Sequence, residues 1–428
     1  MSTHPDQLLR AAMQKHQAGD FAQAQQLYRQ VLAKDPRQPE ALHYLGVLLH
    51  QLGHHATACE HLELAASIKT QDAQVHYHLA SALREAGKPS QAVAALTRCI
   101  EINPSYAPAY SLKGSALKDM GRLVEACAAH RQAIAIKPDF AQAYYNLGIT
   151  LEDMGKHEEA VAAYQQAIVR QPKLLPAYLN LGNLFGALGQ LRESSEIYRK
   201  ALAIQPRDAR CWSNLGNTLC RLGQHEEAVA ACQQAVKLQP NYHLAYNNLG
   251  NALLQLDHTA EAVQAYQQAI VLKPDDALAY SNLGNVLREL EQLDEAVAAC
   301  RRAVELDPTL AEAHYNLGNA LKYVGLADEA VQAYQHAIEL RGNFPEAHTN
   351  LAYFLHFHAG SDAGAIHTEL RRWHHATCPA VAGADSAACP ESQPGSPAEN
   401  RLCLPGFLST GRIVFHRATA GPSRSCRI

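Results

Sequence analysis

Apolar and polar positions alternate along most of this chain with a helical period, in blocks separated by turn-forming residues. Residues 145–172, YNLGITLEDMGKHEEAVAAYQQAIVRQP, show the pattern, with two such blocks on either side of Gly155. An amphipathic 3.6-residue period predicts a helix, and a glycine between two helices predicts a sharp turn. Each pair of blocks therefore predicts a helical hairpin.

The predicted hairpin recurs at a fixed interval of 34 residues. Residues 315–342 read YNLGNALKYVGLADEAVQAYQHAIELRG, a close copy of 145–172. The glycine of each copy's Leu-Gly pair marks the period at Gly46, Gly114, Gly148, Gly182, Gly216, Gly250, Gly284 and Gly318, and Ala12, Ala80 and Ala352 complete the series. Self-similarity at such a period predicts a repeat architecture with ten full units over residues 5–344.

Each unit carries the same small and turn-forming residues at fixed distances from its mark. A glycine follows seven residues later in all full units except those with Asp257 and Glu291, and an alanine follows twelve residues later except at Ser194. Small residues facing each other let two antiparallel helices approach closely. A proline 24 residues after most marks ends the second helix.

These features together resemble the tetratricopeptide repeat, over about four fifths of the chain. The resemblance implies an all-α fold, a right-handed superhelical solenoid of tetratricopeptide helical hairpins with a concave groove. We predict ten repeats of 34 residues over 5–344, a degenerate eleventh repeat with a capping helix over 345–378, and a linker-like, disordered tail over 379–428.

Charge and hydropathy argue against two classes of partner. The formal net charge is -4 and the isoelectric point is near 6.6, without a block of lysine and arginine, which disfavours nucleic acid. The N-terminal segment lacks the apolar core of a signal peptide, and no run of 18 apolar residues occurs. We expect no membrane partner and a cytoplasmic location.

The cysteines and histidines raise the question of metal or redox chemistry. The chain has 11 cysteines and no C-x-x-C pair, and Cys99, Cys232 and Cys300 occupy repeat positions that other units fill with core residues, so we expect buried thiols. The stretch HQLGHHATACEH makes a metal site conceivable. Gly53 divides it between two helices, which favours a solvated surface instead. We predict no metal, no cofactor and no catalytic residue.

Asparagines form the most informative pattern. A first file lies two residues before each mark, at Asn146, Asn180, Asn214, Asn248, Asn282, Asn316 and Asn350, and a second file lies one residue after it, at Asn183, Asn217, Asn251, Asn285 and Asn319. Three residues is nearly one helical turn, so both files share a face of the first helix of each unit.

An amide side chain offers a donor and an acceptor, as the peptide backbone does. The two files therefore predict a surface that binds extended polypeptide with little regard for its side chains. The alternative is that the amides only solvate the groove. Tyr44, His78 and Leu112 stand at the first-file position in earlier units, so a binding ladder would begin at the fifth unit.

The segment after the repeats resembles the junction of bacterial O-linked N-acetylglucosamine transferases. It contains HTNLAYFLHF, then Arg371, Arg372 and Trp373, and later RLCLPGFLS. The resemblance implies an acceptor-binding repeat domain whose catalytic half, which would use a UDP sugar, is missing from these residues. The arginine-rich end suggests a truncated or frameshifted relative of the enzyme, and a tail that evolved as such is the alternative.

We therefore predict a protein-binding module or scaffold, with other proteins or peptides as partners. The alternative function is a protein O-GlcNAc transferase completed elsewhere. Exposed helix faces in repeats of this kind often dimerise, which leaves a homodimer open.

Overall fold

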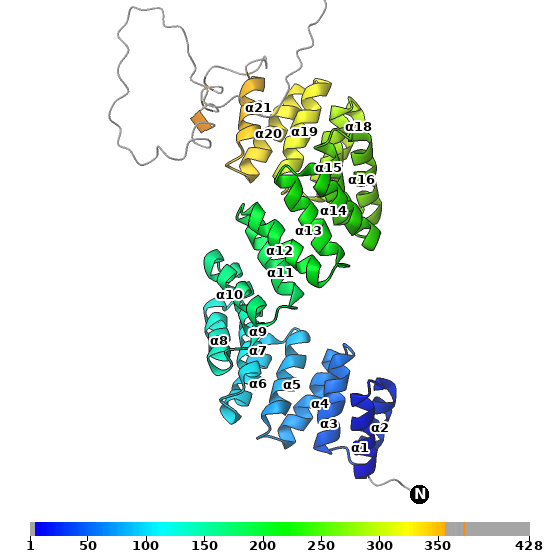
Figure 1. Cartoon of the computed structure of the whole chain (residues 1–428), viewed down its shortest axis with the longest axis vertical. Coiled ribbons are helices and arrows are strands. Elements are labelled where there is room, and N and C mark those ends of the chain that lie inside the picture. Colours follow the sequence, from blue (N-terminus) through cyan, green and yellow to red (C-terminus); the bar gives the residue numbers. More distant parts are fainter. Residues whose placement is uncertain (1–4, 356–363, 365–367, 369–370, 373–428) are drawn as a thin grey trace, which may run out of the picture. The chain divides into compact units, whose positions relative to one another are not determined.

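The computed structural model describes residues 5–355, together with 364, 368, 371 and 372 (Figure 1). Contacts divide the chain into two units, 1–377 and 378–428, and all described residues belong to the first. Most of the predicted capping helix and all of the predicted tail at 379–428 lie outside the described residues.

Helices and their connecting turns make up the described part of the chain. The first helix of each hairpin is α1 (Pro5–Gln17), α3 (Pro39–Gln51), α5 (Ala73–Glu85), α7 (Ala107–Asp119), α9 (Ala141–Asp153), α11 (Leu175–Ala187), α13 (Ala209–Arg221), α15 (His243–Leu254), α17 (Ala277–Glu289), α19 (Ala311–Val324) or α21 (Pro345–Leu355). The second helix is α2 (Phe21–Lys34), α4 (His55–Ile68), α6 (Pro89–Ile102), α8 (Leu123–Ile136), α10 (His157–Arg170), α12 (Leu191–Ile204), α14 (His225–Leu238), α16 (Thr259–Leu272), α18 (Leu293–Leu306) or α20 (Ala327–Leu340). These described residues contain no strand, which confirms the predicted all-α solenoid.

The small mark of each unit lets the two helices of a hairpin touch. A Cβ atom added to Gly148 would lie 2.6 Å from the ring of Tyr164, and Gly182, Gly250 and Gly318 face tyrosine rings in the same way. These tyrosines are fully buried or nearly so. Because each ring fills the space that a mark side chain would need, a larger residue at the mark would overpack the hairpin.

The turn inside each hairpin needs a left-handed backbone. Eight of these turns carry a glycine with φ between 71° and 86°, for example Gly155 and Gly325. Asp257 and Glu291, the two predicted exceptions, adopt the same conformation with φ 61°. The turn geometry is therefore kept even where the residue is unfavourable for it.

Successive hairpins pack on one another, so the apolar side of each is covered by its neighbours. Each second helix contacts the first helix of the following unit, and first helices also contact each other, as α3 does with α5 and α5 with α7. We call the surface formed by the exposed sides of the first helices the first-helix face. Because neighbouring first helices touch, side chains of successive units lie next to each other on this face.

Candidate functional site: an asparagine face with a polar cavity

Both predicted asparagine files lie on the first-helix face. The first file occupies successive first helices from α9 to α21, and all of its members are half-buried. In the second file Asn183 and Asn217 are exposed, while Asn251, Asn285 and Asn319 are half-buried. The amides are thus at the surface but not freely solvated.

Every first-file asparagine donates its side-chain N–H to the preceding unit. Asn248 Nδ2 lies 3.0 Å from Ser213 Oγ, and Asn316 Nδ2 lies 2.9 Å from Ser281 Oγ. The remaining donors are Asn146 to Ser111 and Ser115, Asn180 to Tyr145, Asn214 to Asn183, Asn282 to Asn247 and Asn251, and Asn350 to Tyr315 and Asn319. The file therefore joins neighbouring units, a role that was not among the predictions.

The second file accepts hydrogen bonds at four of its positions, from Arg288 at Asn285 and from tyrosines at the other three. Asn251 Oδ1 accepts from the buried Tyr266 hydroxyl at 2.7 Å and from Asn282 at 3.3 Å. Asn183 and Asn319 accept from Tyr198 and Tyr334 in the same way. Each of these three asparagines accepts the hydrogen bond of a buried tyrosine hydroxyl whose ring packs against the glycine mark of the same unit. The bond links the first-helix face to the core.

Part of the hydrogen-bonding capacity of the first file remains open. The Oδ1 atoms of Asn248, Asn282 and Asn316 accept no hydrogen bond from the described part of the chain. In the second file, the exposed Asn217 makes no side-chain hydrogen bond to these residues. Acceptors spaced along successive helices are what an extended polypeptide with free backbone N–H groups could use.

The sequence contained a signal for the partners of the first file. One residue before the file stands Ser111, Tyr145, Ser213, Asn247, Ser281 or Tyr315, again at multiples of 34. Ser213 and Ser281 are fully buried, so their hydroxyls are removed from water and need these partners.

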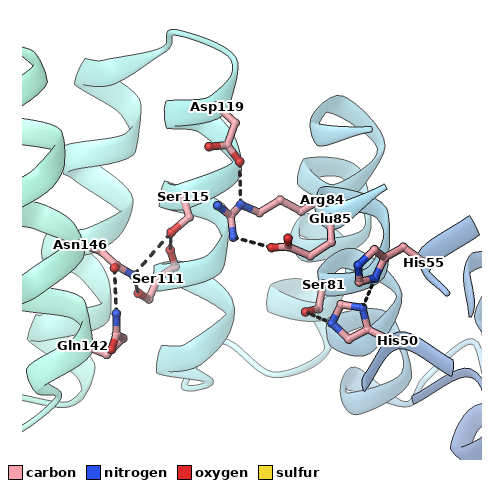
Figure 2. A network of polar contacts seen from close by, with 10 residues as sticks. All are labelled: His50, His55, Ser81, Arg84, Glu85, Ser111, Ser115, Asp119, Gln142 and Asn146. Carbon is pink, nitrogen blue, oxygen red and sulfur yellow. Dashed lines mark hydrogen bonds and ion pairs between the residues drawn. The ribbon is translucent and has the colours of Figure 1, made fainter. Parts of the chain in front are cut away.

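The histidine-rich stretch brings two imidazoles together. His50 at the end of α3 and His55 at the start of α4 approach within 3.0 Å at their Nδ1 atoms, and His50 Nε2 lies 3.1 Å from Ser81 Oγ (Figure 2). His54 is exposed and Cys59 is buried. Within residues 5–355, no group of three or more His, Cys, Asp or Glu side chains is arranged to hold a metal ion.

The thiols that the repeat pattern placed in the core are buried. Cys99, Cys232 and Cys300 are free and fully buried. Burial raises the pKa of Cys232 and of Cys300 to about 12, so neither is a thiolate near neutral pH.

A cavity of about 390 Å³ with a mixed polar and apolar lining lies on the first-helix face, beside α5, α7 and α9. Its lining includes Ser111 and Ser115 of α7, Asn146 of α9 and, from the second helix α8, His130. Figure 2 shows Asn146 reaching across to the two serines.

His130 is the unusual member of this lining. It is 0% exposed, and neither ring nitrogen has a hydrogen-bond partner in the described residues. Burial and the neighbouring Lys118 lower the pKa of His130 to about 4. The imidazole is therefore neutral at pH 7, with one donor and one acceptor unused. Sequence reasoning missed it, although five other units carry tyrosine at its place in the repeat.

No helix among the described residues is long and apolar enough to cross a lipid bilayer.

Comparison with known proteins supports the repeat assignment. Tetratricopeptide-repeat family profiles match residues 15–82, 73–106 and 114–155, and the profile of the cilia and flagella-associated protein 70 C-terminal domain matches 140–352. No curated protein matches the chain. No glycosyltransferase is among these matches.

Three solved structures illustrate the similarity. The anaphase-promoting complex hetero-tetramer Cut9–Hcn1 matches with 15% identity and a TM-score of 0.48, over 89% of this chain and 95% of that one. Two structures of MamA match with 33% and 32% identity and TM-scores of 0.36 and 0.37, over 38% and 40% of this chain and 95% and 92% of theirs.

Proposed function

Because the chain is a tetratricopeptide-repeat protein, we propose that it binds extended segments of other proteins along the first-helix face. The face would form the concave groove of the solenoid from the fifth unit onward. The observation that carries the proposal is that the side-chain oxygens of the half-buried Asn248, Asn282 and Asn316 accept no hydrogen bond from the described residues.

The same geometry gives the amides two roles at once. One N–H of each first-file side chain is held by the preceding unit, which restricts the rotation of the side chain. The side-chain oxygen then points in a fixed direction. Because the asparagine side chain is already restricted, binding a ligand backbone would cost less side-chain entropy than it would at a mobile amide. Ordering the polypeptide still opposes binding by roughly 1–2 kcal/mol per residue. We expect modest affinity for many clients.

An experiment has to separate ligand binding from unit-to-unit bonding, because most of these amides do both. Asn217→Ala removes an exposed amide that has no internal hydrogen bond, whereas Asn241→Ala makes the same change in an exposed turn away from the face. Loss of one hydrogen bond, worth about 0.5–1.5 kcal/mol, predicts about a two- to tenfold weaker affinity for Asn217→Ala alone.

The combined change of Asn214, Asn248, Asn282 and Asn316 to Ala should weaken binding of several unrelated extended peptides together, and should also lower the thermal midpoint. Fluorescence anisotropy with labelled peptides and thermal unfolding measure the two effects separately. Unchanged peptide affinity in both variants would contradict the proposal and leave the amides as structural groups.

We further propose, from sequence resemblance, that the repeats derive from an O-linked N-acetylglucosamine transferase. The HTNLAYFLHF and RLCLPGFLS segments and the Asn files support this origin. Incubation with radiolabelled UDP-GlcNAc and acceptor proteins tests whether this chain transfers sugar. Transfer of sugar by this chain alone would show that it is an enzyme and would contradict a function limited to binding.

A further inference from the structure

The hydrogen bond between the second and third units uses titratable side chains. His78 of α5 stands at the first-file position, two residues before the mark of its unit, and His43 of α3 stands three residues before its own mark, where the first-file partner stands. His43 Nε2 lies 2.8 Å from His78 Nδ1. The two imidazoles therefore make the unit-to-unit bond that Asn248 and Ser213 make further along the chain.

A second imidazole pair lies at the same boundary. His50 Nε2 lies 3.1 Å from the Oγ of Ser81, which belongs to α5 and stands one residue after the mark, at the second-file position (Figure 2). His50 Nδ1 lies 3.0 Å from His55 Nδ1 at the start of α4. Two side-chain hydrogen bonds that join α3 to α5 thus each use a histidine.

An imidazole pair responds to acid and an amide pair does not. A neutral imidazole has one donor and one acceptor, so two neutral rings can share a hydrogen bond. Two protonated rings have only donors, and their charges repel each other. Asparagine and serine side chains do not titrate in this range. Acid should therefore weaken the boundary between the second and third units and leave the asparagine bonds between later units unchanged.

The groups around His43 favour its neutral form. His43 is 4% exposed, and burial, followed by the neighbouring His78, lowers its pKa to about 4. Asp72 and Glu40 oppose this shift, and Lys69 adds to it. Lys69 Nζ lies 3.0 Å from Glu40 and 3.5 Å from Asp72, so both carboxylates already have a cationic partner.

The rings of His50 and His78 are affected in the same way. Burial, followed by His55, lowers the pKa of His50, and Glu85 opposes this shift. Burial, followed by His50, lowers the pKa of His78, and Asp72 opposes this shift. Each ring at the boundary therefore disfavours a proton on its neighbour.

We propose that the boundary between the second and third units is an acid-sensitive joint of the solenoid. Protonation of both rings of a pair removes the side-chain bonds from α3 to α5, and the first two units, α1 to α4, then detach from the stack. Two units are too few to bury their apolar faces alone, so α1 to α4 should unfold locally. The joint needs no bound polypeptide and is independent of the proposed function.

Amide hydrogen exchange of the full chain at pH 7 and pH 5 tests the joint, with protection expressed relative to the intrinsic exchange rate at each pH. The pKa of His43 is about 4 in the fold and 6.5 in the unfolded chain, so stability is fully present above pH 6.5 and falls as the pH drops. His43 alone predicts about 20-fold lower protection of α1 to α4 at pH 5 than at pH 7.

Helices α13 to α16 provide the internal comparison, because asparagines join their units. Their protection should fall much less than that of α1 to α4 between pH 7 and pH 5. An equal fall in both regions would contradict a local joint.

Two double variants replace the imidazole pair with pairs that occur elsewhere in the chain. His43→Ser with His78→Asn copies the serine and asparagine that join α13 to α15. His43→Tyr with His78→Asn copies the tyrosine and asparagine that join α19 to α21, and it fills the buried site better than serine does. Protection at pH 7 shows whether each variant is folded.

In both double variants, the acid-induced fall in protection of α1 to α4 should be about 20-fold smaller than in the wild type. His54→Gln, which removes an exposed histidine near the same boundary, is the matched control and should keep the wild-type fall. The joint is overturned by a full wild-type fall in a folded double variant, or by loss of the fall in His54→Gln.

Discussion

At the scale of single residues, His130 and His43 are unusual, because they are titratable side chains at buried positions of the repeat. His130 is 0% exposed and His43 is 4% exposed, and His43 Nε2 lies 2.8 Å from His78 Nδ1. Burial, together with Lys118 in one case and His78 in the other, lowers the pKa of each to about 4. Both are therefore neutral in the folded protein at pH 7.

These pKa values predict acid sensitivity. Between pH 6.5 and about 4 the unfolded chain binds protons on these histidines and the folded chain does not, so stability is fully present above pH 6.5 and falls as the pH drops. Each histidine should account for about 3 kcal/mol of lost stability by pH 4.

His130→Tyr removes one of the two contributions. Amide hydrogen exchange of α7 and α8, measured at pH 7 and near pH 4, should show a smaller acid-induced loss of protection in this variant than in the wild type. An equal loss in both proteins would mean that His130 takes up its proton without unfolding.

At the scale of elements, the backbone conformation of the turn within each hairpin limits which residues fit at that position. Eight turns use glycine for the left-handed residue, and two use Asp257 and Glu291 at φ 61°. A side chain in this conformation costs about 1–2 kcal/mol relative to glycine. The fold accepts the cost because the packed helices on both sides determine the turn.

Glu291→Gly should therefore stabilise the hairpin of α17 and α18 by about 1 kcal/mol, less the extra entropy that glycine adds to the unfolded chain. Urea unfolding measures the shift in midpoint. Glu295→Gly, the same change inside the first turn of α18, should instead destabilise by about 1 kcal/mol. A loss of stability in both variants would show that Glu291 is not strained.

At the scale of the whole described stack, stability comes from contacts between neighbouring units. Each second helix packs on the next first helix, and the first-file amides bond backward to the preceding unit. A unit cannot cover its apolar side alone, so unfolding should spread over several units.

Gly216→Val tests this coupling. A Cβ atom at Gly216 would overlap Cys232 Sγ and lie 3.2 Å from the Ala228 carbonyl oxygen, so the larger side chain should cost about 1–3 kcal/mol. Hydrogen exchange should show lost protection in α11 to α16, beyond the mutated hairpin itself. Gly342→Val, where an added Cβ meets no atom within 4 Å, is the control. Loss confined to α13 and α14 would argue against coupled units.

The sequence by itself determined the helical hairpin, its repeat period and the close packing of the two helices within it. The marks, turn glycines and terminating prolines are local requirements of close helix approach and chain reversal, so each can be read from one unit and checked against the others. The same regularity placed both Asn files on one face of the first helices, and the structure has them there.

Only the tertiary structure decided what these side chains contact. The bonds from Asn248 to Ser213 and from Asn282 to Asn247 join residues 35 positions apart, and they depend on how one hairpin sits on the next. The cavity beside His130 likewise depends on four helices, α5, α7, α8 and α9, from three units. A repeat pattern specifies the interior of its unit, but distances between units follow from packing, and the chemistry of the face depends on those distances.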